Sequence, residues 1–95
     1  MQFLVIFKIK AGVTPEQLSP LIKSEVAKVW EMHLSGHLRS AHLIHDNGGV
    51  TMMFEAEDRE EVERLLHELP MIRQDLFGYE ILPLAPFTGF SVLFA

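Results

Sequence analysis

The chain opens with QFLVIFKIK, residues 2–10, a segment rich in β-branched and aromatic residues. Before Lys8, apolar residues stand at both the odd-numbered and the even-numbered positions, which face opposite sides of a strand. A strand with this pattern is covered on both faces and lies inside a sheet. Residues 2–10 are therefore predicted to form a central strand, which Gly12 ends.

Two helices are predicted from their capping signals. The sequence TPEQ at residues 14–17 supplies an N-cap hydroxyl, a proline at the first helical position and a glutamine at N3. The helix that begins there is expected to run to Gly36, whose residue type suits a left-handed C-cap, over about 21 residues. A second helix is capped by Asp58, with Glu61 at N3, and is expected to end at Pro70. Its buried stripe consists of Val62, Leu65, Leu66 and Leu69.

The remaining apolar segments are predicted to be strands. Residues 38–46 and 50–56 form a hairpin around the turn sequence DNGG at 46–49, and residues 79–85 form the last strand. Pro83 cannot donate a ladder hydrogen bond, so either the pairing ends there or the strand lies at an edge. The order βαββαβ predicts an α+β protein of ferredoxin-like layout, an antiparallel sheet with two helices on one face.

One face of this predicted sheet is left without helices. We expect a second copy of the chain to cover it, so that the protein is at least a homodimer. Residues 1–86 are expected to form the domain, and residues 87–95, FTGFSVLFA, an apolar C-terminal tail at the subunit interface. A mean hydropathy of +0.19, on the apolar side for 95 residues, agrees with an oligomer.

Composition limits the partners and the location. The net charge is −5, and seven of the thirteen acidic residues lie between Glu55 and Glu68, so nucleic acid is not an expected partner. The acidic stretch is interpreted as the solvated face of the second helix. The chain has no cysteine, and its first apolar segment is too short to span a bilayer and lacks a basic leader. We expect a cytoplasmic protein that does not bind membranes.

Glu25 is the candidate general base. On a helical wheel it falls inside the apolar arc of the first helix, which is formed by Leu18, Leu21, Ile22, Val26, Val29 and Met32. Burial raises the pKa of a carboxyl group and so makes it usable as a base near neutrality. In the alternative interpretation, Glu25 lies at the edge of the arc and pairs with Lys28 or Arg39.

Trp30 and His33 are candidate substrate-binding residues, because they lie at or within the same arc, beyond Glu25. A tryptophan offers a flat surface with one hydrogen-bond donor. The alternatives are that His33 is a core or helix-end residue and that Trp30 only packs.

Arg39 and His42 complete the candidate site. The planar guanidinium of an arginine suits a carboxylate or another organic anion. In a regular strand the two residues point to opposite faces, and a single bulge would be needed to bring them together. Alternatively, Arg39 pairs with Glu25 or with an acid on the outer face.

The five histidines do not predict a metal site. His33 and His37 are spaced i, i+4, but Gly36 is expected to end the helix between them. His42 and His45 are three apart in a strand, so their side chains point to opposite faces. No phosphate-binding loop, dinucleotide fingerprint or nucleophile elbow is present, and no cofactor is expected.

The order and spacing of several short elements resemble the muconolactone isomerase family of aromatic degradation. They are Leu21-x-Lys23-x-Glu25, Gly36-x-Leu38-Arg39, Phe54-Glu55 and Leu69-Pro70, followed by a late strand, within residues 3 to 86. The resemblance implies a ferredoxin-like subunit of a dimeric α+β barrel, obligate oligomerisation, and a proton shift in an unsaturated lactone without a cofactor.

Two functions remain open from the sequence. In the first, Glu25 moves a proton α or γ to a carbonyl while Arg39 holds the anionic group of the substrate. In the second, the chain is a non-catalytic ligand-binding or assembly module. This alternative is motivated by Val26 and Ser40, which stand where family members typically have a lysine and a histidine.

Overall fold

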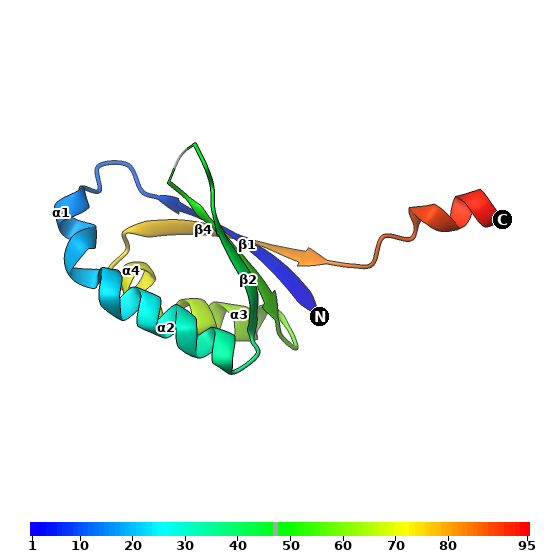
Figure 1. Cartoon of the computed structure of the whole chain (residues 1–95), viewed down its shortest axis with the longest axis horizontal. Coiled ribbons are helices and arrows are strands. Elements are labelled where there is room, and N and C mark those ends of the chain that lie inside the picture. The colour runs from blue at the N-terminus through cyan, green and yellow to red at the C-terminus, as the bar shows by residue number, and fades with distance from the viewer. Residues whose placement is uncertain (47) are drawn as a thin grey trace.

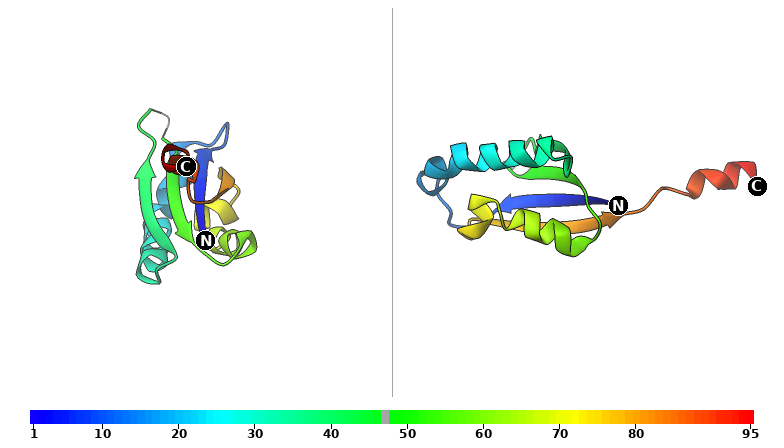
Figure 2. Two further views of the ribbon diagram at one scale, coloured as in Figure 1. Left: turned by 90° about the vertical axis from the view of Figure 1, so that its right-hand side faces the viewer. Right: turned by 90° about the horizontal axis from the view of Figure 1, so that it is seen from below.

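The computed structural model describes residues 1–46 and 48–95. Four strands form one antiparallel sheet in the order β2-β3-β1-β4. They are β1 (Gln2–Ile9), β2 (Leu38–Leu43), β3 (Val50–Glu55) and β4 (Phe77–Leu84). The helices α2 (Ile22–Leu34), α3 (Arg59–Leu66) and α4 (Pro70–Arg73) lie on one face of this sheet (Figures 1 and 2). The predicted ferredoxin-like α+β fold is confirmed.

The sheet order agrees with the strand patterns. β1 lies between β3 and β4, as its two apolar sets predicted. β4 is an edge strand, which explains how it accommodates Pro83. The strands differ in extent from the predictions: β2 ends at Leu43 and β3 at Glu55, and β4 begins already at Phe77. The predicted DNGG turn lies partly outside the described residues, because it includes Asn47.

The first predicted helix is not continuous. It consists of α1 (Pro15–Leu18), the 3-10 helix η1 (Ser19–Leu21) and α2. The prediction of one long α-helix was wrong because it ignored Pro20, which has no N–H to donate and whose ring disfavours an α-helical turn. The end was predicted correctly: α2 ends at Leu34, and Gly36 adopts a φ of 86°.

The second helix begins as predicted but ends differently. The side chain of Asp58 accepts a hydrogen bond from the backbone N–H of Glu61 at 2.8 Å, as an N-cap does. α3 ends at Leu66, four residues before Pro70. Instead of ending this helix, Pro70 occupies the first turn of α4, where its missing N–H costs nothing.

The core lies between the sheet and the helices. Phe3, Val5 and Phe7 of β1 are buried there, and Phe54 of β3 is fully enclosed. Their alternate neighbours point to the other face, where Leu4 pairs across the sheet with Met53 on one side and Leu82 on the other. These side chains are only half-buried, and no helix covers them. The prediction of a sheet face without helices is thus confirmed.

Candidate functional site

A groove runs between α2 and β2 and consists of two adjoining hollows of about 440 and 310 Å³. Val26, Val29 and Ala41 line both of them. Glu25 and His42 line the larger hollow among mainly apolar side chains, and Trp30, His33 and Arg39 line the smaller one. All five candidate site residues predicted from the sequence therefore border one groove, although they are divided between its two parts.

Glu25 is the titratable group with the most distinctive environment in this groove. Its Oε1 accepts a hydrogen bond from the backbone N–H of Met71 at 3.0 Å. Burial raises the pKa of the Glu25 carboxyl above its ordinary value of 4.5, and the hydrogen bond from Met71 opposes this shift. Oε2 makes no hydrogen bond to the described residues, so one oxygen is held and the other is available for proton transfer.

The alternative ion pairs for Glu25 are absent from the described residues. The ammonium group of Lys28 lies 3.0 Å from a carboxylate oxygen of Glu31 and 3.1 Å from one of Glu68. Arg39 forms no ion pair within the described residues. The interpretation of Glu25 as half of an ion pair with either residue was therefore wrong. Sequence reasoning also missed Met71 as its partner, because the two lie 46 positions apart.

Arg39 reaches the groove through a strand irregularity. The register between β2 and β3 shifts between Leu38 and Ser40. Arg39 is therefore the extra residue of a β-bulge and has no paired residue on β3. The bulge that the sequence analysis required is present here. It does not unite Arg39 with His42. His42 borders the other hollow, but it lies opposite Thr51, which pairs with Ile6, so its register is that of the sheet face without helices.

Trp30 and His33 form an aromatic pair beside Arg39. Their ring centroids are 5.3 Å apart with an angle of 33° between the planes. Both residues are exposed near the end of α2, so the interpretation of His33 as a core residue does not fit this chain. The interpretation that Trp30 only packs stays a prediction. His33 does lie in the last turn of the helix.

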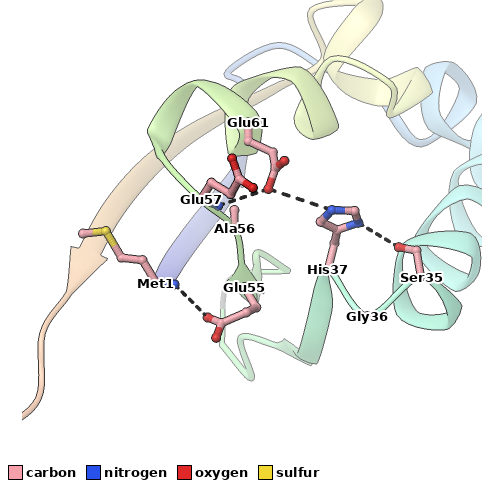
Figure 3. Close-up of a pocket in the computed structure, with 8 residues that line it drawn as sticks. All are labelled: Met1, Ser35, Gly36, His37, Glu55, Ala56, Glu57 and Glu61. Carbon is pink, nitrogen blue, oxygen red and sulfur yellow. Dashed lines mark hydrogen bonds and ion pairs between the residues drawn. The ribbon is translucent and has the colours of Figure 1, made fainter.

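A third hollow, of about 420 Å³, lies outside the groove and contains Ser35, His37 and Glu61 (Figure 3). Ser35 Oγ is 2.9 Å from His37 Nδ1, and Glu61 is 3.9 Å from His37 Nε2. Ser35 Oγ also donates a hydrogen bond to the carbonyl of Met32 at 2.9 Å. The serine proton is directed to the backbone and not to the imidazole, so the arrangement lacks the activated hydroxyl of a nucleophilic triad.

Metal ligands do not converge anywhere in the described structure. Residues 1–46 and 48–95 contain no group of three or more histidine, cysteine, aspartate or glutamate side chains that could hold an ion. In the same residues, none of the helices has the length and apolar character that crossing a bilayer requires.

The fold and groove define a class of protein: a small ferredoxin-like α+β subunit with one half-buried carboxylate in an apolar groove between its long helix and an edge strand. The family model for muconolactone delta-isomerase matches residues 1–89, so the chain belongs to that family. No curated protein matches the chain by sequence comparison.

Several solved structures are similar to this chain, and two of them are described here. Muconolactone isomerase, solved at 3.3 Å resolution, has a TM-score of 0.77 and 18% identity, over 93% of this chain and 92% of the other. The second is 5-chloro-2-hydroxyhydroquinone dehydrochlorinase from Burkholderia phenoliruptrix AC1100, in complex with 2,5-dihydroxybenzoquinone. It has a TM-score of 0.76 and 16% identity, over 94% of this chain and 98% of the other. At these identities the structural likeness shows a shared fold.

Proposed function

We propose that the chain is a cofactor-free isomerase that shifts a proton in a small unsaturated lactone or a related intermediate of aromatic degradation. The single observation that carries the proposal is Glu25 at the apolar groove: its pKa is raised, and its Oε2 accepts no hydrogen bond from the described residues, as suits a general base. Membership of the muconolactone delta-isomerase family supports this reaction class.

Each candidate residue has a role in this reaction. Glu25 removes a proton from a carbon α or γ to the carbonyl and returns it to another carbon of the same molecule, so no co-reactant is consumed. Arg39, which lines the smaller hollow and forms no ion pair with the described residues, holds the anionic group of the substrate. Trp30 and His33 form the wall beside that group, and His42 borders the hollow that contains Glu25.

Isotope exchange tests this function directly. The chain is incubated in deuterium oxide with a carboxylated unsaturated lactone, and the products are followed by NMR. We expect the double bond to move and deuterium to enter at a carbon adjacent to the shifted bond. Binding of the lactone without either change would contradict the proposal.

A second function, a non-catalytic ligand-binding module, is favoured by one contact. The hydrogen bond from Met71 to Glu25 joins α2 to α4, and a carboxylate could serve this purpose alone. A thermal-shift screen with unsaturated lactones and aromatic acids distinguishes the two functions. A ligand at 100 times its dissociation constant stabilises the fold by about 2.7 kcal/mol. Stabilisation without turnover would select the module.

We propose that the chain works in the cytoplasm as a homo-oligomer, with residues 1–86 as the domain and 87–95 as a tail at the interface. The uncovered sheet face supports this assembly, since it presents Leu4, Met53 and Leu82 side by side. Exposed apolar patches of this kind mark interaction surfaces.

The raised pKa of Glu25 predicts a pH-dependent stability. Between the unfolded value of 4.5 and the raised folded value, the folded chain binds more protons than the unfolded chain, so stability falls as pH rises. Glu25→Gln removes this titration but keeps an oxygen acceptor for Met71. We expect the variant to gain stability relative to the parent as pH rises through this window, as measured by urea unfolding.

Glu60→Gln is the matched control, because Glu60 is an exposed carboxylate on α3. Its stability difference from the parent is expected to change less over the same pH range. Parallel pH profiles for the parent and Glu25→Gln would contradict the burial of this carboxyl.

A further inference from the structure

The larger hollow of the groove is lined almost entirely by apolar groups. Among the described residues that border it, only Glu25 and His42 have polar side chains. The others are aliphatic residues, two methionines, one phenylalanine and one glycine, and they come from α1, α2, α4 and all four strands. An apolar wall of this extent is more than the removal of one proton by Glu25 requires.

The size of this hollow also exceeds the need of a small lactone. Its volume of about 440 Å³ equals that of about fifteen liquid waters at about 30 Å³ each. A single lactone ring with one carboxylated side chain occupies less than this. Water fills the remainder poorly, because a bound water needs about two to four polar partners and this lining offers few. The remaining space therefore suits an apolar group.

The order of the side chains along the groove places this space. Arg39 lines only the smaller hollow, and Val29 lines both. Glu25 precedes Val29 on α2, and Leu18 of α1, which lines only the larger hollow, precedes Glu25. A substrate with its anionic group at Arg39 and its reacting carbon at Glu25 thus leaves the part of the hollow beside Leu18 empty, unless it carries a further group there.

The charges in the groove restrict what this further group is. No lysine or arginine is among the described residues that line the larger hollow. A second anionic group would lie there without a counter-charge and in the same hollow as the Glu25 carboxylate, and both effects are unfavourable. The group that fits beside Leu18 is therefore uncharged and apolar.

We infer that the substrate is an unsaturated lactone acid with an uncharged apolar substituent, such as a short alkyl chain, which binds in the larger hollow beside Leu18. This inference rests on the function proposed above, from which it takes the positions of the anionic group and the reacting carbon. It adds the chemical class of the substrate, since the unsubstituted lactone acid is then the weaker ligand.

Calorimetric titration of the full chain tests the inference. The probes are saturated lactone acids with hydrogen, methyl or propyl on the ring carbon farthest from the carboxylate, so that binding is measured without a proton shift. Full burial of a methylene group tightens binding about fourfold, and we expect about threefold for each added carbon. The same dissociation constant for all three probes, or no binding by any of them, would overturn the inference.

Two leucine variants locate the substituent. Leu18→Asn places an amide at the apolar end of the larger hollow and is expected to reduce the advantage of the propyl probe over the unsubstituted one to about threefold or less. Leu34→Asn is the matched control, because Leu34 is 68% exposed and lines neither hollow. Circular dichroism checks that both variants fold. An equal propyl advantage in the two variants would refute the assigned position.

Isotope exchange with the unsaturated homologues separates this inference from the proposed reaction. We expect the propyl lactone acid to exchange and to have the lower KM. Exchange of the unsubstituted lactone with the same or a lower KM would contradict the substituent and leave the isomerase function standing. Tighter binding along the saturated series without any exchange would support the ligand class and contradict the isomerase function.

Discussion

Replacement of Glu25 by glutamine is expected to lower kcat for the proposed proton shift by about 10²–10⁴-fold, the usual contribution of a general base. Glutamine has nearly the same shape and keeps an oxygen that accepts the hydrogen bond from Met71, so the packing of α2 against α4 is retained. What is lost is the ability of Oε2 to take a proton. The measurement is the steady-state rate on the lactone identified by isotope exchange, together with the KM.

Whether the substitution changes kcat or KM indicates the role of Glu25. A base that acts in the transition state changes kcat and leaves substrate binding largely intact. Glu60→Gln again serves as the matched control and should retain the parent rate. A Glu25→Gln variant that keeps full turnover would show that another group abstracts the proton.

Local patterns were sufficient to predict most of the fold. The cap at Asp58, the left-handed Gly36 and the two-sided apolar pattern of β1 depend on neighbouring residues only, and each was predicted correctly. The interruption at Pro20 was also encoded locally, but the capping signals before it were given too much weight. The start of α4 at Pro70 was missed because proline is common both after the end of a helix and in the first turn of a helix.

The site was harder to predict, because its geometry depends on distant parts of the chain. The sequence placed Glu25 among apolar residues, but its partner Met71 becomes a neighbour only when α4 packs against α2. The bulge that gives Arg39 its position follows from the pairing of β2 with β3 and has no signal within β2 itself.

Ile22, Val26, Val29 and Met32 of α2 were placed in one apolar arc of the predicted helix, yet two of them are exposed. Ile22 and Val26 are 51% and 61% exposed, while Met32 is 3% exposed. A hydrophobic pattern indicates that a surface is buried, but it does not indicate whether the same chain or another copy buries it. The apolar residues that remain exposed in the single chain are therefore the ones that indicate assembly.

Replacement of Met53 by lysine is expected to dissociate the proposed sheet-to-sheet assembly. Met53 lies near the middle of the uncovered face, beside Leu4 of β1 and Ser40 of β2. An unpaired charge buried in an interface costs about 3–5 kcal/mol, so the dissociation constant should rise at least about a hundredfold. Size-exclusion chromatography with light scattering at micromolar concentration should show the parent as at least a dimer and the variant shifted toward the monomer.

Gln74→Lys adds the same charge at an exposed position after α4, outside the strands, and should assemble like the parent. A Met53→Lys variant with the mass of the parent would show that the uncovered face is not the interface.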